Sequence, residues 1–167
     1  RYRKDCGIVV PQFFCVSDIE KEQIMSDFRI KTYVLGGVST NCYLVFREGE
    51  KTAVIIDPAD NADYLKNKCR EFGVKPEAVL LTHAHFDHML AADDIRKAYG
   101  CKVYVHMDDE RMLNDPFLNL SGTMGTEQTG ISADHLLRDG DVLHFLNREW
   151  KVMATPGHTA GSVCYYL

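Results

Sequence analysis

The sequence predicts a mixed α/β domain in which helices pack on the outside of one or more sheets. Strand-like segments open the regular part of the chain at residue 28, strands and helices then alternate, and strand-like segments return after residue 138. This order favours layered sheets and helices over an all-helical or all-strand fold. The 167 residues suit one domain, and a composition of 46% hydrophobic and 26% charged residues is typical of a globular core.

The strands are predicted from short β-branched and aromatic segments that are bounded by polar turns. A Glu-Gly-Glu turn at residues 48–50 separates two such segments and indicates a hairpin. We expect strands at Phe28–Leu35, Asn41–Phe46, Thr52–Ile56, Ala78–Thr82, Lys102–His106, Val142–Phe145, Trp150–Ala154 and Ser162–Leu167.

Two helices are predicted between these strands. Apolar residues recur at helical spacing over Asn61–Phe72 and stop at Gly73, and residues 88–99 form a second helical stretch that ends at Gly100. The segment Asn114–Gly130 is rich in Gly, Ser, Thr and Asn and is expected to be one long loop, which in a compact domain is often functional.

The net charge and the cysteines indicate which partners and which cellular compartment to expect. The formal net charge is −5, which does not favour nucleic acid as a partner, and no apolar run is long enough to span a membrane. Six cysteines are present without a Cys-x-x-Cys pair, and four lie in apolar or helical segments, so we expect reduced thiols and a cytoplasmic protein.

The strongest chemical signal follows the predicted strand Ala78–Thr82 directly. It reads His83-Ala-His85-Phe-Asp87-His88. Imidazole is the commonest metal ligand in proteins, and in extended geometry His83 and His85 project to the same side. The chain then turns, so that Asp87 and His88 reach a neighbouring point, with His88 near the start of the second helix. This spacing suits two adjacent metal ions better than one.

A second signal is the Gly/Pro-rich loop from Thr155 to Ser162, which contains His158. Because ligands are commonly presented at the ends of strands, His158 is expected to complete an all-histidine face. The three remaining histidines, His106, His135 and His144, lack such a context, and we expect them to be structural or at the surface.

Three motifs in this order resemble the metallo-β-lactamase superfamily over about residues 28–167. They are Asp57-Pro58, His83-x-His85-x-Asp87-His88 and Gly157-His158-Thr159. Further segments resemble the glyoxalase II-like branch, the hydroxyacylglutathione hydrolases: Asn41-Cys42-Tyr43, the loop with Asp115-Pro116 and Asn119-Leu120-Ser121, and Thr155 to Ser162.

The resemblance implies an αββα sandwich with a metal site at one edge of the sheets. By position, His83, His85 and His158 hold the first metal, and Asp87 and His88 belong to the second. Asp57 resembles an aspartate that orients a ligand loop without touching the metal. The implied cofactor is zinc, as one or two ions, with iron or manganese as alternatives.

The function implied is hydrolysis of a small-molecule thioester by metal-bound hydroxide. Asp87 is the expected catalytic residue, because it can hold the nucleophile in line and accept its proton. Alternatives are a lactonase, a β-lactamase or a single-iron sulfur dioxygenase of the same fold, or an inactive metal-binding fragment. The oligomeric state is left open.

The family pattern also predicts that this domain is incomplete at its C-terminal end. In the family a bridging aspartate and a further histidine follow another strand, and both would lie beyond Leu167. Met25 stands just before the regular pattern, so residues 1–24 are expected to be an N-terminal extension and residues 25–167 the domain without its C-terminal part.

Overall fold

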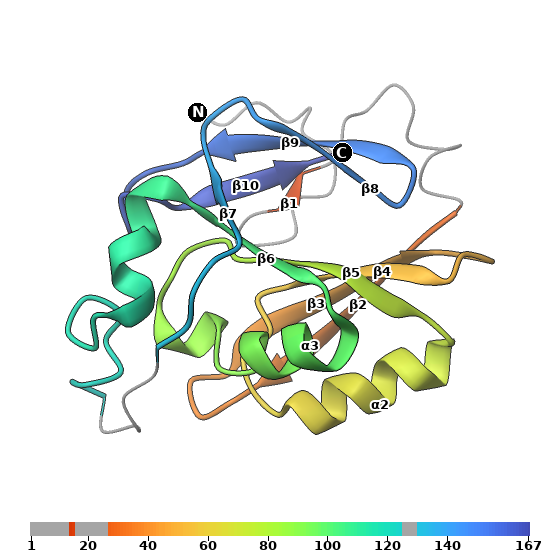
Figure 1. Cartoon of the computed structure of the whole chain (residues 1–167), viewed down its shortest axis with the longest axis horizontal. Helices are drawn as coiled ribbons and strands as arrows, with labels where there is room; N and C mark the ends of the chain where they lie inside the picture. Colours follow the sequence, from red (N-terminus) through yellow and green to blue (C-terminus); the bar gives the residue numbers. More distant parts are fainter. Residues whose placement is uncertain (1–13, 16–26, 125–129) are drawn as a thin grey trace, which may run out of the picture.

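A computed structural model describes residues 14–15, 27–124 and 130–167, and they form three stacked layers (Figure 1). A six-stranded sheet lies in the middle, helices α2 and α3 cover one of its faces, and a four-stranded sheet lies against the other. The predicted mixed α/β class is confirmed. Within the described ranges no helix covers the outer face of the small sheet, so the second helical layer of the expected αββα sandwich is not among these residues.

The large sheet has the order β2-β3-β4-β5-β6-β7, and the small sheet has the order β1-β10-β9-β8. The large-sheet strands are β2 (Phe28–Leu35), β3 (Thr40–Arg47), β4 (Thr52–Ile56), β5 (Lys75–Leu80), β6 (Lys102–His106) and β7 (His135–Leu137). The small-sheet strands are β1 (Phe14–Cys15), β8 (Val142–Phe145), β9 (Arg148–Ala154) and β10 (Val163–Tyr166). The helical elements are α2 (Ala62–Phe72), η1 (Phe86–His88), α3 (Ala92–Tyr99) and η2 (Met107–Asn114).

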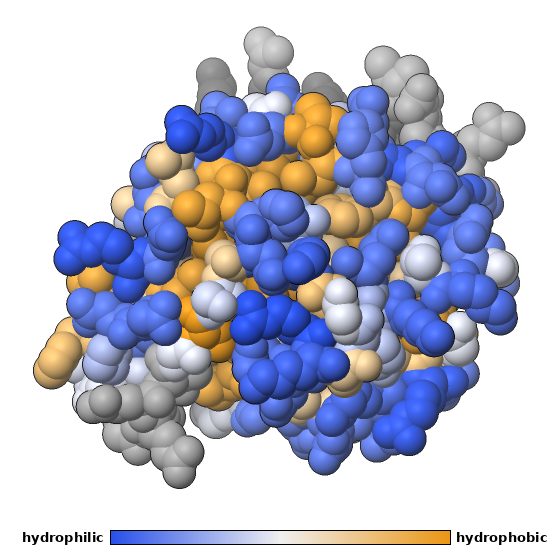
Figure 2. Space-filling model, viewed as in Figure 1, coloured by the Kyte–Doolittle hydropathy of each residue, from blue (hydrophilic) through white to orange (hydrophobic). Residues whose placement is uncertain are grey.

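Side-chain alternation along the central strands divides the interior into two cores. In β4, Ala53 and Ile55 face the helices, whereas Val54 and Ile56 face the small sheet. The second core includes Trp150, which is fully buried. On the face drawn in Figure 2, polar side chains cover the helices and apolar ones gather near the small sheet.

Most predicted elements are confirmed, with differences where pairing decides the bounds. Strand β5 begins at Lys75, earlier than expected, because Lys75 pairs with Thr52 on β4. The predicted helix over 88–99 is wrong at its start, because a short 3₁₀ turn, η1, holds His88 and α3 begins only at Ala92.

Two elements were missed by the sequence pattern. Residues 107–114 form η2, and residues 135–137 form β7, which pairs in parallel with β6.

The predicted loop 114–130 is described except at residues 125–129. Strand β1 lies within the segment predicted as an N-terminal extension and pairs with β10, and residues 1–13 and 16–24 of that segment lie outside the described part. No helix in the described ranges has the length and apolar character needed to cross a membrane.

We expect Tyr165→Phe to lower the free energy of unfolding by about 1–3 kcal/mol. The Tyr165 hydroxyl is buried and donates a 2.8 Å hydrogen bond to the Leu81 carbonyl, which links the two sheets beside the histidine cluster. Urea denaturation measures the change. Tyr104→Phe, at a partly exposed ring stacked on His135, is the control and should stay within about 0.5 kcal/mol of the parent. Equal stability of Tyr165→Phe and the parent would contradict this assignment.

Candidate metal centre

The candidate site lies at the carboxyl ends of three parallel strands, β4, β5 and β6. Their register aligns Ile56 with Leu80 and Leu80 with Tyr104, so all three strands end at the same edge of the sheet. Open α/β sheets commonly bind ligands at this edge. The loop between β9 and β10 reaches the same edge, because the Val163 amide at the start of β10 donates a 2.9 Å hydrogen bond to the Thr82 carbonyl.

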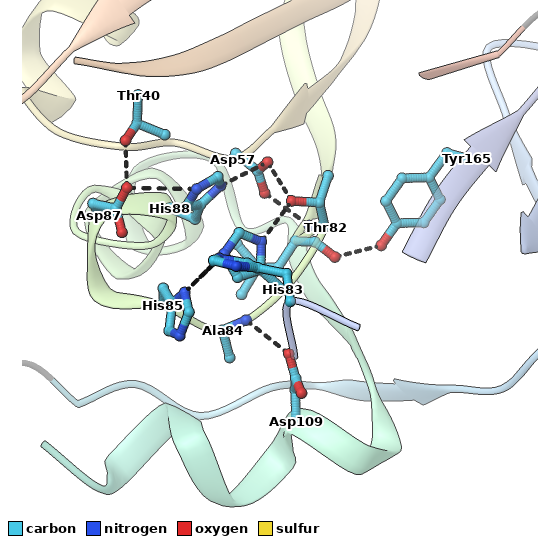
Figure 3. Close-up of polar contacts among 12 residues, drawn as sticks. Thr40, Asp57, Thr82, His83, Ala84, His85, Asp87, His88, Asp109 and Tyr165 are labelled. Carbon is cyan, nitrogen blue, oxygen red and sulfur yellow. Dashed lines mark hydrogen bonds and ion pairs between the residues drawn. The ribbon is translucent and has the colours of Figure 1, made fainter. Parts of the chain in front are cut away.

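Asp57, the first residue after β4, fixes the loop after β5. Its buried carboxylate accepts a 2.8 Å hydrogen bond from the Thr82 amide and a 2.6 Å bond from the Thr82 hydroxyl. It also lies 2.9 Å from His88 Nδ1, although not at the angle of a hydrogen bond. Asp57 thus contacts the ligand loop that the sequence analysis expected it to orient (Figure 3).

The Thr82 hydroxyl determines the tautomer of His83. It has one hydrogen, which it donates to Asp57, so it can only accept from His83 Nδ1 at 3.1 Å. The lone pair of His83 is then on Nε2, which faces the other histidines. Burial, with the nearby imidazoles, lowers the pKa of His83 to about 2, so the ring is neutral, as a metal ligand must be.

Three imidazole nitrogens converge from two loops. His85 Nδ1 lies 3.1 Å from His83 Nε2 and 3.0 Å from His158 Nε2, and these ligand atoms all lie within 4.8 Å of one another. Burial and the His158 ring lower the pKa of His85 below its ordinary value. The structure therefore brings the three predicted ligands together, 73 residues apart along the chain for His85 and His158.

This donor set fits a metal ion. His85 Nδ1 has either one hydrogen or one lone pair, so it cannot satisfy both neighbouring nitrogens with well-formed hydrogen bonds. Two nitrogens on a tetrahedral zinc, at ~2.0–2.1 Å from the ion, lie about 3.3–3.4 Å apart, close to the two separations of 3.1 and 3.0 Å around His85 Nδ1. A cation bound by all three nitrogens explains these short separations better than hydrogen bonds between the rings do.

Asp87 and His88 lie directly beside this cluster. The Thr40 hydroxyl donates a hydrogen bond to Asp87 Oδ2, and that oxygen lies 3.5 Å from His88 Nε2. The His88 ring packs against that of His83 in a tilted arrangement, with 4.0 Å between the ring centroids. Burial by itself lowers the pKa of His88, but the Asp57 and Asp87 carboxylates together outweigh burial, so the pKa is raised. The second predicted pair is thus adjacent to the first three ligands.

Asp109 is the residue of this region that sequence reasoning missed. It lies in η2 within the charged stretch Asp108-Asp109-Glu110, a pattern that indicates solvent exposure. Asp109 is nevertheless fully buried. The signal that could have found it is its position just after β6, at the edge where Asp57 and Thr82 follow β4 and β5.

The other histidines lie outside the cluster, as expected. His106 is buried and caps η2, with its Nδ1 accepting from the Asp108 amide at 3.3 Å. His135 stacks on Tyr104, and His144 is exposed on β8.

This combination of layered sheets and a histidine-rich edge defines a metallo-β-lactamase-like domain. A model of the metallo-beta-lactamase superfamily matches residues 35–167, so the chain belongs to that superfamily. The family and fold predicted from the sequence are confirmed.

Relatives and solved structures agree with this assignment. The Bacillus subtilis (strain 168) protein named "Probable metallo-hydrolase YqgX" is 36% identical over 134 residues, which is 80% of this chain and 63% of that protein. The crystal structure of the B3 metallo-beta-lactamase BLEG-1 has a TM-score of 0.78 and 39% identity, covering 83% of this chain and 66% of that one. A di-iron-bound form of TTHA1623 has a TM-score of 0.67 and 29% identity, covering 81% and 66%.

The chain therefore spans about two thirds of the length of these relatives, between 63% and 66%. A hydroxyacylglutathione hydrolase of Salmonella paratyphi B (strain ATCC BAA-1250 / SPB7) is 32% identical over 126 residues, which is 75% of this chain and 43% of that enzyme. The placement in the glyoxalase II-like branch stays a prediction.

We expect Thr82→Val to lower the free energy of unfolding of the metal-free protein by about 1–3 kcal/mol, because the buried Asp57 carboxylate loses a hydroxyl donor. Thr82→Ser keeps the hydroxyl and is the matched control, with a smaller loss. Urea denaturation in the presence of a chelator measures both. If Thr82→Ser lost as much stability as Thr82→Val, the hydroxyl would not be the cause.

Proposed function

We propose that the protein is a metal-dependent hydrolase that cleaves a thioester at the site formed by His83, His85 and His158. The observation that carries this proposal is the convergence of three imidazole nitrogens next to Asp87 and His88. A zinc or iron ion bound there would lower the pKa of a coordinated water and polarise a carbonyl group.

The chain's own residues prepare this site in two ways. The Thr82 hydroxyl, held by Asp57, accepts from His83 Nδ1 and so leaves Nε2 of that ring free to bind an ion. Thr40 anchors Asp87 through Oδ2, which leaves Oδ1 to accept a proton from an attacking water. We therefore assign Asp87 as the proton acceptor, and His88 with Asp87 as the candidate ligands of a second ion.

A thioester suits this set of residues. A thiolate leaves readily, since a free thiol has a pKa of about 8.5, so the reaction needs no strong general acid. The likeness to a hydroxyacylglutathione hydrolase supports the same substrate class. The buried, unpaired thiols of Cys42, Cys69 and Cys101 support the proposal of a reducing, cytoplasmic compartment.

A β-lactam is the second candidate substrate. The observation that favours it is the match to the B3 metallo-beta-lactamase BLEG-1, at 39% identity and a TM-score of 0.78. Both substrates present a carbonyl carbon to a nucleophile, so the site geometry allows either. They differ in the leaving group, which is a thiolate in one case and a ring nitrogen in the other.

We expect the purified chain to bind zinc, and we expect His83→Ala and His85→Ala to abolish both this binding and thioester hydrolysis. Loss of a ligand should weaken zinc binding by more than the roughly 10- to 100-fold that loss of an outer partner costs. Elemental analysis gives the metal per chain, and a thiol-trapping assay gives turnover. His144→Ala, at an exposed histidine outside the cluster, is the control.

Each outcome of these assays distinguishes one candidate function from another. Thioester turnover that survives in His83→Ala would overturn the proposal. Zinc binding with no turnover of thioester, β-lactam or lactone would favour the inactive metal-binding fragment. Turnover of the β-lactam alone would favour the second candidate. Iron in place of zinc, without turnover of any of these substrates, would point to the sulfur dioxygenase alternative.

A further inference from the structure

Asp109 is a buried acid that the proposed reaction does not use. Its side chain is fully buried in η2, directly after β6. No Lys, Arg or His side chain among the described residues forms an ion pair with it. Its carboxylate is surrounded by hydrogen-bond donors from other parts of the chain. A buried carboxylate is costly unless such donors satisfy it, so these contacts constrain the segments that supply them.

The donors come from both loops that carry the histidine triad. From the first loop, the Ala84 amide, between His83 and His85, donates to Asp109 Oδ2 at 3.1 Å (Figure 3). From the second loop, next to His158, the Thr159 hydroxyl donates to the same oxygen at 2.7 Å and the Gly161 amide donates to Oδ1 at 2.7 Å. One carboxylate therefore joins the two loops.

Gly161 gives independent evidence that this junction is tight. A Cβ atom at this position would lie 2.7 Å from Asp109 Cγ and 2.8 Å from the Asp109 backbone nitrogen, closer than real Cβ contacts allow. The loop is also closed on itself, since Ser162 Oγ accepts from the Thr159 amide at 3.1 Å and lies 2.8 Å from the Thr159 hydroxyl. The His158 loop is thus seated on Asp109 as a rigid turn.

We propose that Asp109 is a positioning residue that sets the separation between the His83–His85 loop and the His158 loop, and thereby the metal affinity of the triad. This inference rests on the metal site of the proposed function and does not depend on the substrate. Asp109 forms no hydrogen bond with the three imidazoles among the described residues, and it acts through the backbone of Ala84 and the turn after His158.

The charge and shape of a carboxylate are both needed for this role. Oδ2 accepts from both loops and Oδ1 accepts from the Gly161 amide. In either orientation the NH₂ group of an asparagine would face a backbone N–H donor, that of Ala84 or that of Gly161. Asp109→Asn should therefore displace one loop from the other. Thr159→Val removes the hydroxyl contact between the His158 loop and Asp109, and Thr159→Ser keeps it.

The experiment measures zinc affinity by competition with a chelator and, separately, the urea stability of the metal-free protein. We expect Asp109→Asn and Thr159→Val to raise the Kd for zinc about 10- to 100-fold, and Thr159→Ser to stay within about twofold of the parent. Cobalt(II) absorption spectra should change in Asp109→Asn, because the ligand geometry changes. Asp134→Asn is the control: this carboxylate also accepts from a backbone amide, that of Val103 at 2.9 Å, but at the other end of β6.

A purely structural role predicts a different result: lower stability of the metal-free protein with an unchanged Kd and cobalt spectrum. That result would overturn the proposal. If Asp109→Asn does not fold, the Thr159→Val and Thr159→Ser pair decides, and equal zinc affinities in this pair would overturn it as well. A parent chain that binds zinc but cleaves no thioester would contradict the proposed function alone. A parent chain that binds no metal would contradict both.

Discussion

The parallel pairing of β4, β5 and β6 is the constraint on which the rest of the site depends. Because these strands run in the same direction and in register, their carboxyl ends meet at one edge, and the residues that follow them become neighbours. A slip of one residue would exchange the side chains that face the helices with those that face the small sheet. The two apolar cores therefore fix the register, and the register fixes the place of Asp57, Thr82 and Asp109.

Two buried carboxylates convert this shared edge into a defined geometry. Asp57 ties the end of β4 to the start of the histidine loop, and Asp109 ties that loop to the turn after His158. Asp57 accepts from one backbone amide and the Thr82 hydroxyl, and Asp109 accepts from two backbone amides and the Thr159 hydroxyl. Since an unsatisfied buried carboxylate is costly, the donors have little freedom to move away. The loops owe their order to these polar contacts as well as to apolar packing.

The histidine triad would couple metal binding to the stability of the fold. Three imidazole nitrogens that face one another offer no complete hydrogen-bonding solution, and His83 is held neutral by its surroundings. A bound cation would satisfy all three lone pairs at once, and its binding free energy would add to the stability of the folded chain.

The sequence by itself determined the mixed α/β class, most strand bounds and the cluster from His83 to His88, because side-chain period, turn residues and adjacent ligands are local properties. The helix start at Ala92 and strand β7 escaped it, since both depend on pairing and packing with distant segments. The loop context and the family resemblance predicted that His158 joins His85, and the structure brings the two together across 73 residues. Only the tertiary structure decided that Asp109 is buried, because its charged neighbours in the sequence indicate an exposed segment. The physical reason is that burial and long-range contacts are set by strand register and layer packing, which no local pattern encodes.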